Sequence, residues 1–324
     1  MTVRLLSYGG IITEIAVPDR RGVSGNVVLA LRDLQAYEAR ANFGSLLGRY
    51  ANRISGGGFT LQGKRYDLAG NADGISSHGG PRGFGARVWQ AETFQHGEDA
   101  GVTLRYLSVD GENGYPGNLA VKATFTLTEA NALRIDYEAA TDRATVLNLS
   151  HHAYFNLAGG ASVYEHRVQV MADRYTPIDA SKVPTGAIEP VAGTPFDLRV
   201  ATRLADRVES NHPQVLLAKG FDHNFVLDKP AAGALSLAAR IVEPGSGRSL
   251  EVRTTQPGLQ LYTANGFDGS LRDAAGHALN RGAGIALETQ HYPDSPNQSA
   301  FPSTRLDPGA TFRSTTEYRF GLVR

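Results

Sequence analysis

The sequence contains no cysteine and no long apolar run in its 324 residues. Without cysteine the protein cannot form disulfides, thiolate metal sites or a cysteine nucleophile. No stretch approaches the ~20 apolar residues that span a bilayer. Residues 1–17 also show no apolar core of a signal peptide. We therefore expect a cytoplasmic protein without a membrane partner.

The chain also lacks an excess of charge of either sign, with 32 basic and 32 acidic residues. No basic run suggests a nucleic-acid partner, so a neutral, polar small molecule fits the composition better. The nine histidines show no HExxH or comparable metal spacing. The glycines at 56–58 lack the lysine and the following helix of a phosphate-binding loop.

The clearest pattern that is present is alternation of apolar and polar residues with period two. It runs through 119–127 and 133–137, with a turn at 129–132, and so predicts a hairpin. Further strands are predicted at 103–109, 166–171, 248–253, 258–263 and 283–289. Only 31–41 and 198–210 could hold short helices. Many short strands separated by turn residues indicate an all-β sandwich or barrel.

The 37 glycines and 15 prolines are spread along the chain rather than gathered into a linker. The proline-rich segment 176–197 carries Ile178, Val183, Ile188 and Phe196, apolar residues that a solvated linker would not need. We expect this segment to be a structured connection, and residues 1–324 to form one domain.

Five polar clusters lie in apolar or glycine-rich surroundings. They are Asn52-Arg53, His78-Gly79-Gly80, His151-His152-Ala153-Tyr154, Phe221-Asp222-His223-Asn224 and Leu287-Glu288-Thr289-Gln290. Each cluster is a weak signal alone. Together they supply an acid, a base, a fixed cation and several hydrogen-bond donors.

Glu288 follows the apolar run 284–287. It is either an exposed residue at a strand end or a carboxylate in a cleft, where burial would raise its pKa and make it a general base. His151 and His152 lie on an apparent strand, 146–154. Because neighbouring strand residues point to opposite faces, at most one of them can enter a given site. That histidine is either structural or a proton donor.

Arg53 and Asp222 also allow two interpretations. Arg53 is either an ion-paired surface residue or a fork of donors for hydroxyl groups. Asp222 could cap a turn through its own backbone or bind a ligand.

Taken together, these motifs resemble the aldose 1-epimerase (galactose mutarotase) family. The resemblance covers nearly the whole chain. It is carried by GRYANRISGG (48–57), HGGPRGF (78–84), NLSHHAYFNLAG (148–159), TPID (176–179), VPTG (183–186), GTPFD (193–197), GFDHNF (220–225), TQPGLQLYT (255–263) and LETQHYPDSPNQ (287–298).

The resemblance implies a large antiparallel β-sandwich with few short helices and a site in an open cleft. It implies that His152 is the general acid and Glu288 the general base in anomer exchange of free aldohexoses. Sugar-binding residues carried over by position are Asn52, Arg53, His78, Tyr154, Asp222 and Gln260. Such a reaction needs no cofactor and no metal. The expected partner is a monosaccharide, bound by a monomer or weak homodimer.

Three other functions remain open from the residues alone. Asp222 and Glu288 could be the carboxylate pair of a glycoside hydrolase. A sugar-phosphate epimerase would need more basic side chains around the pocket than Arg53 alone. A carbohydrate-binding module could keep the aromatic and arginine contacts but would not need both His152 and Glu288.

Overall fold

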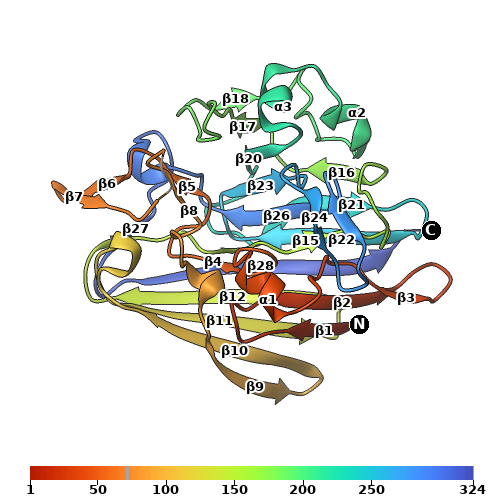
Figure 1. Ribbon diagram of the computed structural model, residues 1–324, viewed down its shortest axis with the longest axis horizontal. Helices are drawn as coiled ribbons and strands as arrows, with labels where there is room; N and C mark the ends of the chain where they lie inside the picture. Colours follow the sequence, from red (N-terminus) through yellow and green to blue (C-terminus); the bar gives the residue numbers. More distant parts are fainter. Residues whose placement is uncertain (71–72, 324) are drawn as a thin grey trace.

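The computed structural model describes residues 1–70 and 73–323 and is built mainly from antiparallel strands (Figure 1). The larger sheet has nine strands. In spatial order they are β19 (Thr202–Arg203), β16 (Arg167–Val170), β21 (Ser236–Val242), β22 (Arg248–Thr254), β28 (Thr311–Leu322), β12 (Ala132–Thr141), β11 (Leu119–Thr128), β10 (Asp99–Ser108) and β9 (Gln90–His96).

A second sheet has six strands. Their order is β15 (Tyr154–Phe155), β26 (Ile285–Gln290), β23 (Gly258–Tyr262), β20 (Asp222–Val226), β17 (Arg174–Thr176) and β18 (Glu189–Pro190). The N-terminal sheet consists of β1 (Thr2–Leu5), β2 (Ile12–Pro18) and β3 (Ser24–Asn26).

Smaller elements complete the described structure. Five strand pairs are β13 (Thr145–Val146) with β27 (Arg305–Leu306), β14 (Ser150–His151) with β4 (Leu46–Leu47), β24 (Asp268–Arg272) with β25 (Ala278–Asn280), β5 (Arg53–Ile54) with β8 (Ser76–Ser77), and β6 (Gly58–Leu61) with β7 (Lys64–Asp67). The helices are α1 (Leu34–Glu38), α2 (Ala205–Val208) and α3 (Pro213–Ala218), with 3-10 turns at Phe84–Ala86, Glu112–Gly114 and Ser295–Asn297.

The two large sheets share one hydrophobic core. Phe125 and Ile135 from the nine-stranded sheet belong to the same buried cluster as Leu261 and Leu287 from the six-stranded sheet. Strands β11 and β12 contribute every second residue to this cluster, as expected for a sheet with one face packed inward. The result is the antiparallel β-sandwich that the family resemblance implied. Among the described residues, no helix is long and apolar enough to cross a membrane.

The predicted hairpin is confirmed. Strand β11 pairs with β12 from Leu119 opposite Thr141 to Thr128 opposite Ala132, and the turn between them contains Asn131. The two predicted helical segments hold α1 and α2, but α3 was missed. The prediction of one continuous strand over 146–154 is wrong. This segment is split into β13, β14 and the start of β15, which pair in turn with β27, β4 and β26. Because the segment crosses from one sheet to the next, it does not pair with a single partner strand along its length.

The proline-rich connection supplies the edge strand β18 of the six-stranded sheet, and its Phe196 packs in the core against Tyr175 and Phe225. Ile178, Val183 and Phe196 are buried, while Ile188 is only half-buried. The side-chain amide of Gln214 in α3 donates to the carbonyl of Ile178, and its oxygen accepts from the Ile178 N–H. This anchoring confirms a structured connection, and the carbonyl of Lys182 in the same segment accepts a hydrogen bond from Arg53.

Candidate active site

Strand β26 places Glu288 on the outer face of the six-stranded sheet. Ile285 and Leu287 point into the core, so the alternation of the strand turns Glu288 the other way. On the neighbouring strand β23, Gln260 pairs in register with Glu288. On the next strand, β20, Asn224 pairs in register with Gln260. The three side chains form a row of polar groups on a sheet face that is covered rather than solvated, since each is 2 % exposed or less.

His152 faces Glu288 from the segment between β14 and β15. Its Nε2 atom lies 3.6 Å from Oε1 of Glu288, and its ring is buried. The neighbouring His151 points into the core, where its Nε2 bonds the carbonyl of Gly10 and its Nδ1 accepts from the N–H of Ala153. The two histidines therefore have different surroundings, and only His152 lies beside Glu288, in line with the prediction that at most one of them enters the site.

Burial moves the pKa values of this pair in opposite directions. Desolvation, assisted by the negative charge of Asp222, raises the pKa of Glu288 to about 8. Desolvation lowers the pKa of His152 to about 4, against an opposing effect of Asp222. The raised carboxyl pKa agrees with the sequence-based expectation for a buried Glu288. The imidazole of His152, the expected general acid, is neutral at pH 7 in the free protein because burial lowers its pKa.

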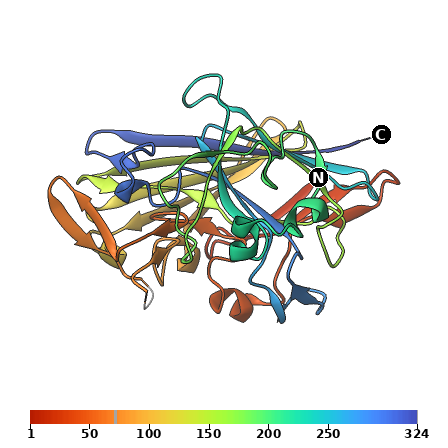
Figure 2. The ribbon, with the colours of Figure 1, turned by 90° about the horizontal axis from the view of Figure 1, so that it is seen from above.

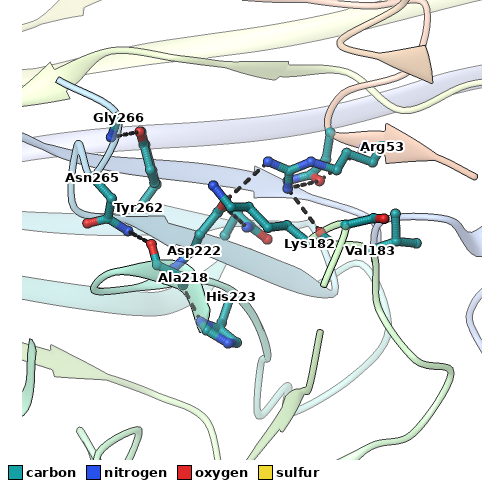
Figure 3. A network of polar contacts seen from close by, with 12 residues as sticks. Arg53, Lys182, Val183, Ala218, Asp222, His223, Tyr262, Asn265 and Gly266 are labelled. Carbon is teal, nitrogen blue, oxygen red and sulfur yellow. Dashed lines mark hydrogen bonds and ion pairs between the residues drawn. The ribbon is translucent and has the colours of Figure 1, made fainter. Parts of the chain in front are cut away.

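Arg53 and Asp222 form an ion pair beside the proton-transfer pair. Nη2 of Arg53 lies 3.1 Å from Oδ2 of Asp222, and Nη1 donates to the carbonyl of Lys182 at 3.1 Å (Figure 3). Nε2 of Gln260 donates to the other carboxylate oxygen of Asp222 at 2.7 Å. Burial alone raises the pKa of Asp222, but Arg53 and the Gln260 bond together hold it below its ordinary value. Asp222 is thus a fixed carboxylate rather than a turn cap.

His78 is held by the backbone of Asn52, whose N–H donates to Nδ1 of His78 at 3.1 Å. Both residues have positive φ, +50° for His78 and +65° for Asn52, which turns the two loops toward each other. Burial holds the pKa of His78 well below its ordinary value. A neutral imidazole carries one N–H, so with Nδ1 accepting, the proton is on Nε2 and His78 is a donor.

This tautomer bears on metal binding. Within the described part of the chain, His78, His152 and Glu288 have ligand atoms within 4.8 Å of one another, a spacing that could suit a metal ion. A metal needs the lone pair of a deprotonated ring nitrogen. In His78 that lone pair, on Nδ1, is already used by the N–H of Asn52. The arrangement therefore suits a ligand with hydrogen-bond acceptors better than a metal ion.

Aromatic rings border the pair on a further side. The ring of Tyr154 lies 4.7 Å from that of His152, and Tyr262 lies 6.2 Å from it, edge-on. The phenol oxygen of Tyr262 accepts a hydrogen bond from the N–H of Gly266 at 2.9 Å (Figure 3). The structure thus brings the predicted acid, base and sugar-binding residues, which are far apart in the sequence, into one cluster.

Two polar residues on the same face were not among the predicted site residues. Asn224 and Gln290 are 1 % and 0 % exposed, and their side-chain amides have no hydrogen-bond partner within the described structure. They stand two positions after Asp222 and Glu288, so strand periodicity places them on the same face. That spacing is visible in the sequence and is the signal that could have identified them.

Comparison with known proteins gives a consistent result. Residues 1–319 match the sequence model of the family described as aldose 1-epimerase. The chain is 42% identical over its full length to the galactose mutarotase of Rattus norvegicus, covering 92% of that protein. It is 35% identical to the aldose 1-epimerase of Escherichia coli K12, with 99% of this chain and 92% of that protein covered.

Solved structures agree. An aldose epimerase homologue from C. elegans superposes with a TM-score of 0.89 at 29% identity, covering 99% of this chain and 96% of that one. The galactose 1-epimerase of Lactobacillus acidophilus superposes with a TM-score of 0.87 at 30% identity, and the match covers 99% of this chain and 91% of that one. The fold, the site and these relatives together show that the chain belongs to the aldose 1-epimerase family and is an isomerase with mutarotase activity.

Proposed function

We propose that the chain interconverts the α and β anomers of free aldohexoses such as D-galactose and D-glucose, with Glu288 as general base and His152 as general acid. The observation that carries this proposal is the 3.6 Å separation of His152 Nε2 and Glu288 Oε1. Two groups at this spacing can serve two oxygens on one sugar carbon, namely the anomeric hydroxyl and the ring oxygen.

Anomer exchange requires the ring to open, the C1–C2 bond to rotate and the ring to close on the other face of the aldehyde. Glu288 removes the proton of the anomeric hydroxyl while His152 protonates the ring oxygen, and the roles reverse on closure. Oε2 of Glu288 has no hydrogen-bond partner within the described structure, which leaves it available to the hydroxyl. Each positioned group of this kind contributes typically ~10²–10⁴ in rate.

The proton count of the pair suits this reaction. With a pKa of about 8 for Glu288 and about 4 for His152, the pair carries one proton between these values, on Glu288 in the free protein. The reaction starts with that proton on His152. A sugar hydroxyl that donates to Glu288 favours the carboxylate, and a ring oxygen that accepts from His152 favours the imidazolium. Substrate binding therefore moves the proton to the acid.

The remaining predicted residues hold the other hydroxyls. Asp222 accepts hydrogen bonds, Arg53 and the Nε2–H of His78 donate them, and the free side-chain oxygen of Gln260 accepts. Asn52 orients His78 through its backbone and Arg53 through its side chain, whose Oδ1 accepts the Arg53 N–H at 3.0 Å. Tyr154 packs beside the acid.

Polarimetric mutarotation of freshly dissolved α-D-galactose and α-D-glucose tests the proposal. We expect both rotations to reach equilibrium faster in the presence of the protein, and the rate to scale with its concentration. Unaccelerated mutarotation with saturable sugar binding would show a carbohydrate-binding module instead. Release of reducing sugar from aryl glycosides would show a hydrolase, and either result would overturn the proposal.

A further inference from the structure

Asp294 is a buried carboxylate that the proposed reaction does not use. Its side chain is 0 % exposed, and it stands directly before the 3-10 turn Ser295–Asn297. An aspartate before a helical turn usually caps it by accepting the first N–H groups. Here the side chain makes no such bond to the turn and is directed to Ser55 instead. Its role is therefore not that of a local cap.

Four neutral donors hold the carboxylate of Asp294. The N–H and the hydroxyl of Ser55 donate to Oδ1 and Oδ2 at 2.9 Å and 2.8 Å. The side-chain amides of Asn297 and Gln298 donate to the same two oxygens at 2.8 Å and 3.2 Å. In addition, the N–H of Asp294 donates to the carbonyl of Arg53 at 2.8 Å. Asp294 thus binds the chain on both sides of Ile54, and we call these contacts the Asp294 clamp.

The local structure around Arg53 gives its backbone little support. Arg53 begins β5, a strand of two residues that pairs with the two residues of β8. Gly56, Gly57 and Gly58 follow, with φ of +61°, +69° and +154°. Glycine adopts such angles freely, so this run adds little stiffness to the chain. The position of the Arg53 backbone therefore depends on contacts from other segments.

The segment that forms the clamp also carries the general base. Glu288 lies on β26, and Asp294 follows shortly after the end of that strand. Between them, the N–H of His291 donates to Oδ1 of Asn148 at 2.9 Å, and the Asn148 amide donates to the carbonyl of His291 at 3.2 Å. In both Figure 1 and Figure 2 the blue segment after β26 lies beside the orange hairpin of β6 and β7. The clamp therefore ties the backbone of Arg53 to the strand of Glu288.

The side chain of Arg53 acts on the site from this fixed backbone. Its guanidinium lies 3.1 Å from Oδ2 of Asp222. Its charge opposes the raised pKa of Glu288, which burial and Asp222 cause, and adds to the lowering of the His152 pKa by burial. These effects weaken with distance, so they require Arg53 to stay in place. The other charged or titratable groups that face the pair are Asp222, His78, Tyr154 and Tyr262.

We propose that Asp294 is a positioning residue of the active site, which fixes the backbone of Arg53 so that its guanidinium is held against Asp222 and beside the proton-transfer pair. The proposal rests on the proposed function, because that function gives Arg53 its sugar contacts. It goes beyond that function in assigning a task to a residue that acts only through another.

Two substitutions loosen the clamp to different degrees. Asp294→Ala removes all four bonds to the carboxylate, whereas Asp294→Asn keeps an oxygen that can accept from Ser55 and Asn297. A displacement of about 1 Å at a catalytic site can cost ~10²-fold in rate. We therefore expect D294A to lower kcat/KM for α-D-galactose by about ten- to hundredfold, with a higher KM, and D294N to lower it by less than about tenfold. Polarimetry measures both.

Either variant can refute the positioning role. Wild-type kcat/KM in D294A, or a loss in D294N as large as in D294A, would contradict it. If D294A does not fold, D294N must still show a lower kcat/KM and the pH shift described below, and a D294N variant identical to wild type would refute the proposal.

Asp19→Ala is the matched control. Asp19 is also a buried carboxylate, 5 % exposed, and accepts from the N–H groups of Arg21 and Val23 at 2.8 Å and 2.9 Å in the turn after β2. Both alanine variants should lose stability, so rates are compared below the unfolding transition of each protein. D19A should keep kcat/KM within about twofold of wild type. A loss as large as that in D294A would mean that destabilisation alone lowers activity, and the proposal would be wrong.

A double-mutant cycle with Arg53→Gln separates positioning from a purely structural role. The variant R53Q/D294A should lie within about twofold of R53Q in kcat/KM, because no guanidinium is left to position. D294A should also shift both limbs of the pH profile to higher pH, as R53Q should, and D19A should shift neither. Losses that multiply in the double variant, or limbs that do not move in D294A, would refute the proposal. An R53Q variant with the wild-type rate would also refute it, whereas absence of mutarotation by the wild-type protein would overturn the proposed function.

Discussion

The Nε2 atom of His152 lies 3.6 Å from Oε1 of Glu288, and both side chains are buried. We expect Glu288→Gln and His152→Gln each to lower kcat/KM for α-D-galactose by ~10²–10⁴. The double variant should be little worse than the single ones, because the two groups act in the same step. Polarimetry, which follows the change of optical rotation with time, or a coupled dehydrogenase assay measures these rates.

Exposed residues of the same types provide the controls for that experiment. Glu189→Gln changes a glutamate on the edge strand of the same sheet, and His96→Gln changes a histidine on β9. Both should keep wild-type rates, and all four variants should keep the circular dichroism spectrum of the fold. If E288Q or H152Q retained kcat/KM within about threefold of wild type, the assigned roles would be wrong.

The pH dependence of kcat/KM should follow the proton count of the pair. We expect a plateau between about pH 4 and about pH 8, bounded by the pKa of His152 and that of Glu288. Above the upper limit the pair loses the proton that the acid must donate, and below the lower limit Glu288 can no longer act as base. A profile from about pH 3.5 to about pH 10 in overlapping buffers tests this. A single limb centred near pH 6 would contradict it.

Substitutions of Asp222 and of Arg53 should shift the pH plateau of kcat/KM in opposite directions along the pH axis. The Asp222 carboxylate raises the pKa of both Glu288 and His152, and the Arg53 guanidinium lowers both. Asp222→Asn should therefore shift both limbs to lower pH, and Arg53→Gln should shift them to higher pH. Both variants should also raise KM, because each removes a sugar contact. Limbs that move the same way in the two variants would exclude this electrostatic coupling.

The raised pKa of Glu288 has a consequence for stability. Its pKa is about 8 in the folded protein and about 4.5 when unperturbed, so the folded state holds the proton more tightly. The associated stability is fully present below about pH 4.5 and is lost as pH rises through about 8. Glu288→Gln stays neutral, so its Tm should exceed that of wild type at pH 9, and the difference should shrink toward pH 5. Calorimetry at both pH values measures it, and a constant difference would refute the linkage.

Gly79 should tolerate no side chain. It has φ +85°, and a Cβ there would lie 1.9 Å from the carbonyl oxygen of Gly48. Gly79→Ala should destabilise the fold by about 3–5 kcal/mol. Gly97 is the matched control, with φ +61° and no atom within 4 Å of the position that a Cβ would occupy. Gly97→Ala should cost only about 1–2 kcal/mol. Urea denaturation compares them, and equal losses would show that backbone strain alone governs position 79.

Strand periodicity by itself predicts much of the fold. The hairpin of β11 and β12 is legible in the sequence because one face is buried, which forces apolar residues to alternate. The same signal fails between 146 and 154. There, short ladders with three different partners replace one continuous strand, and local sequence does not record which partner a residue meets.

The sequence by itself determined the chemical inventory of the site and, through its motifs, the family. Strand alternation predicted that at most one of His151 and His152 enters a given site, but β14 ends at His151. Only the tertiary structure decided the protonation states. Burial raises the pKa of Glu288 and lowers that of His152, and burial depends on which distant segments cover the sheet.

The tertiary structure also decided what Asp222 and His78 do. The carboxylate is held by Arg53, 169 residues earlier in the chain, and the imidazole tautomer is set by the N–H of Asn52. These are contacts between residues far apart in sequence, and no local pattern encodes them. The acid and base were therefore present in the sequence, but their proton and their partners exist only in the folded chain.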